Sequence, residues 1–281
     1  MLLLDFYPKK SKGQNFLVDK NIIKKIISNI SLSKDEVLLE IGSGYGVITR
    51  ELASYAKKVI AVELDKKLYA YLMKDSENLE NIEFVNKNIL KLDLGGLLKK
   101  LKIWQKIKVF GNIPYNITSP ILEYIFENKR FIDTAYLMVQ KEFAQRLIAK
   151  PNTKEYSSIT CFAQFHAKPT VLFSVKKTCF RPKPKVDSCF IKLEPNLLEK
   201  NSFELVPKNK KLLFKIIHSA FNKRRKNILN SLSSIIDKDQ LLSILLELDI
   251  DARSRAENIS LTEYVKISNL CFDTFGGVKP C

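Results

Sequence analysis

The first two thirds of this chain alternate short apolar runs with stretches of helical periodicity, and no other feature of the sequence constrains the fold as strongly. Such alternation is typical of strands that cross over through helices into a mostly parallel α/β sheet. An amphipathic helix is predicted at residues 19–30, where isoleucines share one face and Asp19 can cap the start. The pattern predicts strands at residues 37–41, 59–63, 82–86, 107–110, 135–139, 171–175 and 186–193. We therefore expect an α/β domain built on a mostly parallel sheet.

The strand signals stop after Glu194, and the remainder of the chain has the periodicity of helices. Helices are predicted at residues 209–221, 223–234, 238–248 and 261–271. A chain of 281 residues is long enough for a large domain and a small one. We predict an α/β domain over residues 1–195, a small all-helical domain over residues 205–281, and a connection between them at residues 196–207.

The charge of the chain favours a polyanionic partner. The net charge is +17, and each phosphate that a basic side chain neutralises releases condensed counterions. Residues 207–226 carry eight Lys or Arg and no acid, and residues 168–185 carry six and again no acid. The alternative is that biased codon usage produced a lysine-rich, solvated surface. The clustering favours a nucleic-acid partner over that alternative.

Membrane, metal and disulfide proteins are disfavoured. Every apolar run is shorter than the roughly 18 residues that a spanning helix needs, and the N-terminus lacks the pattern of a signal peptide, so we expect a cytoplasmic location. The five cysteines are scattered without the paired spacing of a zinc site, and only two histidines could add imidazoles. Neither a metal nor a disulfide is expected.

A glycine-rich turn follows the first predicted strand, in the segment VLLEIGSGYG. Gly42, Gly44 and Gly46 lack the Cβ that would block a tight turn and the approach of a ligand. Glu63 ends the next predicted strand, where a doubly wound fold places the carboxylate that binds the two ribose hydroxyls. Together they predict a site for a ligand that contains a nucleoside. NAD remains a competitor at this point, although the spacing is G-x-G-x-G rather than G-x-G-x-x-G.

The most specific signal is NIPY, Asn112 to Tyr115, after the strand at residues 107–110. The amine N6 of adenine is a poor nucleophile because its lone pair is delocalised into the ring. The Asn112 side-chain oxygen and the Ile113 carbonyl could each accept one N6 hydrogen and stabilise the charge that develops on the nitrogen. Tyr115 would stack on the ring. Asn before X-Pro is also a common turn signal, but its place after this strand favours catalysis.

With these motifs in view, the sequence resembles the KsgA-type small-subunit ribosomal RNA adenine N6-dimethyltransferases. The resemblance covers almost the whole chain and implies a Rossmann-like class I methyltransferase domain followed by a small helical domain. It rests on eight blocks in the family's order: GQNFL, EIGSGYG, VELD, NIPYNITSPIL, MVQKEFAQRL, FRPKPKVDS, FNKRRKNILNSL and RAENIS.

The resemblance implies that the cofactor is S-adenosylmethionine. Asn15 and Leu17 match the positions that close over its methionine end, and Leu64 would lie beside its adenine. Asn88 stands where the family usually has an aspartate that accepts a hydrogen bond from the cofactor's adenine amine; an amide oxygen can still accept that bond. The implied cofactor site consists of Asn15, Leu17, Gly42, Glu63, Leu64, Asn88 and Asn112.

The resemblance also implies a catalytic set of Asn112, Tyr115 and Phe180, in which Phe180 sandwiches the flipped target base opposite Tyr115. The alternative for Phe180 is that it packs in the core. A basic helix suits the phosphates of an RNA duplex, and the alternative is a solvated helix end. The basic residues expected to bind RNA are Lys223, Arg224, Arg225 and Lys226.

The implied activity is the transfer of methyl groups to N6 of adenosines, two adjacent ones being expected, in the 3′-terminal hairpin of small-subunit ribosomal RNA. The product would be N6,N6-dimethyladenosine, made during ribosome maturation. We expect the protein to act as a monomer on the RNA or on a partly assembled small subunit. Three alternatives stay open: a large-subunit methylase of the macrolide-resistance type, a non-catalytic assembly factor, and a nicotinamide-dependent oxidoreductase.

Overall fold

The computed structural model describes residues 14–75, 79–195 and 206–275. The chain divides into two compact units. Of the described residues, the first comprises those up to Ala144 together with Thr170–Pro195, and the second comprises Gln145–Pro169 together with those from residue 206 onward. The predicted connection at residues 196–207 falls largely outside the described residues.

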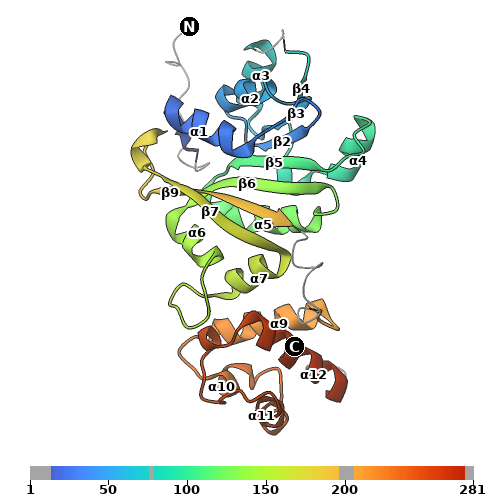
Figure 1. The fold of residues 1–281 in the computed structure, drawn as a ribbon, viewed down its shortest axis with the longest axis vertical. Helices are drawn as coiled ribbons and strands as arrows, with labels where there is room; N and C mark the ends of the chain where they lie inside the picture. Colours follow the sequence, from blue (N-terminus) through green and yellow to red (C-terminus); the bar gives the residue numbers. More distant parts are fainter. Residues whose placement is uncertain (1–13, 76–78, 196–205, 276–281) are drawn as a thin grey trace. The chain divides into compact units, whose positions relative to one another are not determined.

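The first unit is built on a seven-stranded sheet (Figure 1). In spatial order the strands are β4 (Ile82–Val85), β3 (Lys58–Val62), β2 (Val37–Ile41), β5 (Ile107–Asn112), β6 (Ile132–Gln140), β9 (Ser188–Pro195) and β7 (Ala167–Val175). The strands from β4 to β6 in this order are parallel to their neighbours, and β9 pairs antiparallel with β6. The expected Rossmann-like α/β fold is therefore confirmed.

Helices connect these strands as the periodicity predicts. Asp19 caps α1 (Lys20–Ile30), because its Oδ1 accepts from the N–H groups of Asn21 (2.9 Å) and Ile22 (3.1 Å). The apolar face of α1 is buried, as its isoleucine spacing predicts. The other helices that follow strands or turns are α2 (Val47–Ala53), α3 (Lys66–Asp75), α4 (Leu94–Lys100), α5 (Thr118–Glu127) and α6 (Lys141–Leu147).

Two very short strands have no counterpart in the prediction. β1 (Phe16–Leu17) and β8 (Phe180–Arg181) pair antiparallel, with Leu17 opposite Phe180. A strand of two residues is too short to show an alternating pattern, so only its partner in space reveals it. This short antiparallel pair fixes the segment around Phe16, whose ring lies next to Gly44.

The second unit is helical. Its core joins residues of α7 (Ser158–His166) to the C-terminal helices, with Tyr156, Cys161, Phe221 and Tyr264 among the buried members. Residues 145–169 thus pack with the C-terminal helices, although they lie within the segment predicted as the first domain. The C-terminal helices are α9 (Lys210–Asn222), α10 (Ile228–Leu232), α11 (Lys238–Glu247) and α12 (Leu261–Phe275).

The prediction of a helix over residues 223–234 is wrong at its start. Residues 223–226 form a turn, and α10 begins only at Ile228. Asn227 sets this boundary, because its side chain accepts from the N–H of Asn230 and so caps the helix. Among the described residues, no helix is long and apolar enough to cross a membrane.

Candidate active site

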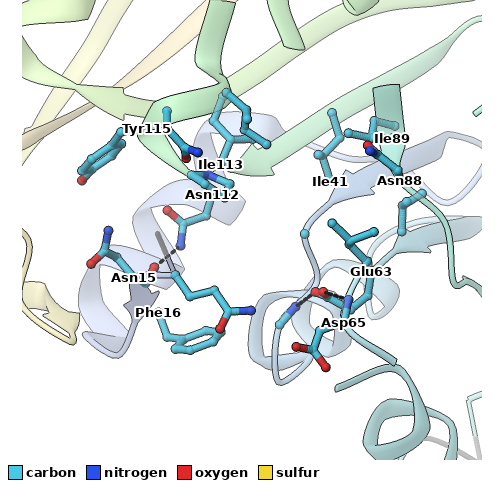
Figure 2. Close-up of a pocket in the computed structure, with 18 of the residues that line it drawn as sticks. Asn15, Phe16, Ile41, Glu63, Asp65, Asn88, Ile89, Asn112, Ile113 and Tyr115 are labelled. Atoms are coloured by element: carbon cyan, nitrogen blue, oxygen red, sulfur yellow. Dashed lines mark hydrogen bonds between the residues drawn. The ribbon is translucent and has the colours of Figure 1, made fainter. Parts of the chain in front are cut away.

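An open cavity of about 280 Å³ lies in the first unit at the carboxyl ends of β2, β3 and β5. This edge is where ligands bind in open α/β sheets, and the volume is just below the range of roughly 300–1,000 Å³ that is usual for ligand sites. Figure 2 shows the two sides of the cavity: Asn15, Asn112 and Tyr115 on one, and Glu63, Asp65 and Asn88 on the other. The sequence motifs from four separate segments therefore meet in one place.

The glycine turn forms part of the cavity wall. Gly42 and Gly44 have φ values of 78° and 58°, in the left-handed region that favours glycine. A Cβ on Gly44 would lie 2.9 Å from Cε1 of Phe16, whereas a Cβ on Gly42 would meet no atom within 4 Å and would occupy open cavity. The absence of a side chain at residue 42 thus leaves room for a ligand against the backbone.

Glu63 follows β3 and is 6% exposed. Its Oε2 accepts from the N–H of Gly44 (3.0 Å), and its Oε1 accepts from the N–H of Asp65 (2.7 Å). Burial raises the pKa of this carboxyl, and the two backbone hydrogen bonds oppose that rise. Because each carboxylate oxygen has a second lone pair, Glu63 can still accept hydrogen bonds from two hydroxyls in the cavity.

Leu64 and Asn88 line the same side of the cavity. Leu64 is 59% exposed and lines the cavity, so its apolar surface is available to a ligand bound there. The Asn88 side-chain oxygen accepts from the N–H of Leu90 (3.0 Å) and caps the short helix Ile89–Lys91. An amide oxygen accepts two hydrogen bonds, so one remains for a ligand amine.

Asn112 is the last residue of β5, and its amide has a defined orientation. Its Nδ2 donates to the backbone carbonyl of Asn15 (2.9 Å), as the dashed line in Figure 2 shows. Because the nitrogen is turned toward Asn15, the side-chain oxygen is left as the acceptor of this group. An acceptor fixed at the carboxyl end of a strand is suited to hold a ligand's amino group.

Tyr115 lines the cavity from the short helix Tyr115–Ile117. Its Oη lies 2.7 Å from Oγ of Ser188, the fully buried first residue of β9, and the two hydroxyls form a hydrogen bond. Burial raises the pKa of the Tyr115 phenol, so the hydroxyl stays neutral. The ring is thus held at its far end and can offer a face to a planar ligand.

A second, smaller hollow shares Phe16, Gly42 and Asn112 with the cavity. Glu40 lines this hollow, although its side chain is almost fully buried and accepts a hydrogen bond from Thr49. Burial is the largest cause of the rise in the pKa of Glu40 to about 7. Beside the cavity, the chain therefore holds a carboxyl that ionises near neutral pH.

Comparisons with known proteins show the family of the whole chain. Residues 6–273 match the family described as ribosomal RNA adenine dimethylase. The chain belongs to that family. Membership confirms the resemblance predicted from the motifs and makes the chain a methyltransferase, which excludes the nicotinamide-dependent alternative.

Curated relatives of similar length agree with the family. A Clostridium botulinum (strain Loch Maree / Type A3) protein named ribosomal RNA small subunit methyltransferase A is 37% identical over 270 residues, 96% of each chain. A Clostridioides difficile (strain 630) protein of the same name is 36% identical over 268 residues, 95% of this chain and 91% of that one.

Solved structures agree in fold. A dimethyladenosine transferase from Plasmodium falciparum superposes with a TM-score of 0.75 at 26% identity, covering 94% of this chain and 99% of that one. The 23S rRNA methyltransferase ErmE superposes with a TM-score of 0.65 at 26% identity, covering 91% and 98%. The class I methyltransferase fold is therefore confirmed.

The cavity of this family member brings together most of the predicted site residues. Asn15, Gly42, Glu63, Leu64, Asn88, Asn112 and Tyr115 line it. Leu17 is buried and lines only the smaller hollow. Sequence reasoning missed Gln14, Phe16, Asp65 and Ile89, which also line the cavity. Each of these residues is next to a predicted site residue in the sequence, and only this adjacency could have indicated that it lines the cavity.

Phe180 does not line the cavity. Its side chain is 0% exposed and lies in the apolar core with Leu17, Met138 and Phe190. The register of β1 with β8 sets Phe180 opposite the buried Leu17. The structure therefore shows the core packing considered as the alternative, and a ring stacked on a target base would have to leave this core. That role for Phe180 stays a prediction.

The four predicted RNA-binding residues of the second unit are exposed, but they are not equivalent. Arg224 donates from Nη2 to the carbonyls of Lys154 (2.9 Å) and Tyr156 (3.2 Å), and its Nε lies 3.5 Å from Oε2 of Glu257. Its guanidinium thus ties the turn to other segments of the same unit. Lys223, Arg225 and Lys226 make no such contact among the described residues.

Proposed function

We propose that this protein transfers methyl groups from S-adenosylmethionine, bound in the cavity, to N6 of adenosines in small-subunit ribosomal RNA. The observation that carries the proposal is the Asn112 amide, which the Asn15 carbonyl orients beside a cavity with the features of a nucleoside site. The names of the curated relatives support a small-subunit substrate. By the same resemblance we infer N6,N6-dimethyladenosine as the product, made at two adjacent adenosines of the 3′-terminal hairpin.

The residues present fit the cofactor. Glu63 has free lone pairs for the two ribose hydroxyls, and Leu64 offers an uncovered apolar surface to the adenine. Asn88 retains one acceptor position for the adenine amine. Asn15, Gly42 and Leu17 adjoin the region where the cavity and the smaller hollow meet, which suits the methionine end.

When bound, S-adenosylmethionine supplies an electrophilic methyl group on a sulfonium, which is a good leaving group. The chain's own residues then have to position and polarise the target amine. The Asn112 side-chain oxygen and the Ile113 carbonyl accept the two N6 hydrogens, so that the nitrogen lone pair turns toward the methyl group. Tyr115 stacks on the flipped base, and the surplus proton leaves to water. No covalent nucleophile is needed.

The second unit supplies the RNA-binding surface in this proposal. Residues 207–226 carry eight basic residues and no acid, and Lys223, Arg225 and Lys226 present exposed cations for phosphates. We propose that the protein works as a monomer, because the RNA itself provides the large contact surface.

The test uses labelled S-adenosylmethionine with purified small and large ribosomal subunits from a strain that lacks these methyl groups. The proposal predicts label in small-subunit RNA as N6,N6-dimethyladenosine near the 3′ end, identified by mass spectrometry. Label in large-subunit RNA instead would assign the protein to the macrolide-resistance type. Cofactor binding without transfer to either subunit would favour the assembly-factor alternative.

A further inference from the structure

The only tryptophan of the chain is also one of its most exposed large side chains. Trp104 is 78% exposed and lies between α4 and β5, in a segment that forms no part of the candidate active site. Leu101 and Ile103, its apolar neighbours, are half-buried. A single exposed apolar side chain is common on a protein surface, so the charges around Trp104 decide what its exposure means.

Lysines surround this tryptophan in the sequence. Residues 94–108 contain five lysines and no acid. Lys108 pairs with Glu36 (2.9 Å), whereas the other four are exposed: Lys99, Lys100, Lys102 and Lys106. The nearby Asp35 carboxylate accepts from Oγ of Ser33 (2.6 Å). Trp104 is therefore an exposed aromatic ring within a run of exposed lysines, and the nearby Glu36 carboxylate pairs with Lys108.

Backbone and side-chain hydrogen bonds hold the residues on both sides of the ring. The N–H of Ile103 donates to the carbonyl of Leu98 (2.9 Å), and Nε2 of Gln105 donates to the carbonyl of Asp35 (2.6 Å). Trp104 is thus presented by a fixed segment. Binding there would require little ordering of the chain, which favours affinity.

The patch formed by Trp104, Lys99, Lys100, Lys102 and Lys106 lies at one end of a strand, and the cavity lies at the other end. β5 begins at Ile107, directly after the lysine-rich segment, and ends at Asn112 in the cavity. A strand of this length spans about 17 Å. Figure 1 shows α4, which precedes Trp104, at the side of the sheet where β5 starts. A nucleotide in the cavity cannot touch Trp104, so a ligand there is a separate molecule or a distant part of a large one.

We infer that Trp104 with Lys99, Lys100, Lys102 and Lys106 forms a second RNA-binding site, in which Trp104 stacks on an unpaired base and the lysines contact the adjoining phosphates. Base stacking on aromatic rings combined with cations along the backbone is how proteins hold single-stranded RNA. The inference rests on the proposed function for the choice of RNA as the polyanion.

The chemistry of the patch favours RNA over two other anionic partners. Insertion into a membrane interface takes a wider apolar face, and here Leu101 and Ile103 are turned partly inward. An acidic protein would be attracted by the lysines but would not require a single exposed indole among them. Unpaired bases satisfy both features at once.

The indole makes a direct test possible, because it is the sole source of tryptophan emission. The full chain is titrated with an RNA hairpin that has unpaired loop bases, and with a fully paired duplex of equal length, while emission and the anisotropy of labelled RNA are recorded. We expect strong quenching by the hairpin and little by the duplex. Trp104→Ala is expected to weaken hairpin binding by about tenfold, and Trp104→Phe to restore most of it.

The lysines are tested through the salt dependence. Lys100→Gln with Lys102→Gln is expected to reduce the slope of log affinity against log salt by about 1.4, since each phosphate contact to a single strand contributes about 0.7. Lys24→Gln with Lys74→Gln, at two exposed residues of the same unit outside this segment, removes the same charge and serves as the control. Tyr55→Ala, at another exposed ring of that unit, is the control for the aromatic change.

Saturating RNA binding with unchanged emission would overturn the inference, as would quenching by anionic vesicles or by an acidic protein but not by RNA. Methyl transfer measured in parallel separates this inference from the proposed function. Transfer without quenching would refute only the second site, and quenching without transfer would refute only the proposed activity.

Discussion

At the scale of the residue, Asn88 offers a direct test of how the cavity holds the cofactor's adenine. Its single oxygen both caps the helix Ile89–Lys91 and is expected to accept from the adenine amine. Asn88→Asp provides two oxygens and a charge, so one can cap while the other accepts a stronger, charge-assisted bond. We predict severalfold tighter binding of S-adenosylmethionine by calorimetry. Unchanged or weaker binding would place the adenine elsewhere.

Glu40 gives a prediction about pH. Burial raises the pKa of Glu40 from its ordinary 4.5 to about 7. Between pH 4.5 and pH 7 the folded chain therefore keeps a proton on Glu40 that the unfolded chain has released. The free energy of unfolding therefore falls by up to about 3 kcal/mol as pH rises from about 4.5 to 7. Above pH 7 this contribution stays level. Glu40→Gln cannot ionise and is expected to lack this loss. The free energy of unfolding of both proteins is measured by denaturation at a series of pH values. The same pH dependence in both would contradict a raised pKa at Glu40.

At the scale of the element, the hydrogen bond between Tyr115 and Ser188 joins the NIPY turn to the start of β9. Ser188→Ala frees the ring end, and we predict a fall of about tenfold in the single-turnover rate of methylation with little change in cofactor affinity. Tyr115→Phe removes the same bond, so the two effects should not add. Ser188→Thr keeps the hydroxyl and should restore the rate. Additive effects would show that the bond does not position Tyr115.

The elements themselves differ in how far the sequence predicts them. The strand at residues 37–41 is predicted at its observed bounds because it is a buried run between turn signals, apolar at every position except Glu40. The two-residue ladder of β1 and β8 and the late start of α10 are set by a partner strand and by the Asn227 cap. The glycine turn, Glu63 and Asn112 are predictable as site residues because the carboxyl ends of parallel strands meet at one edge of a sheet. The position of Phe180 is not predictable from the sequence, because its burial depends on the register in which β8 pairs with β1.

At the scale of the whole molecule, the division into units depends on packing that the chain order hides. Residues 145–169 precede the last strands, yet Tyr156 and Cys161 lie in the core of the helical unit. No local pattern could assign them there, because the apolar faces of helices do not specify which partner they bury against.

The same unit gives a matched pair of substitutions. Arg224 bonds two backbone carbonyls of residues 154–156, whereas Arg225 is exposed. Arg224→Gln is predicted to destabilise the protein by about 1–2 kcal/mol in urea unfolding, because the carbonyls lose a charged donor. Arg225→Gln should leave stability unchanged and weaken RNA binding at low salt. If Arg225→Gln lowered stability and Arg224→Gln weakened only RNA binding, the roles assigned to the two arginines would be wrong.

The proposed activity depends most on Asn112 as the acceptor that holds the target amine. The decisive measurement is the single-turnover rate of methyl transfer to unmethylated small subunits for the native chain and for Asn112→Ala, with the affinity for S-adenosylmethionine measured on the same samples. We predict a rate reduced by at least about a hundredfold, as when a transition-state hydrogen bond is removed, and an affinity changed far less. A variant that methylates at the native rate would contradict the proposed site.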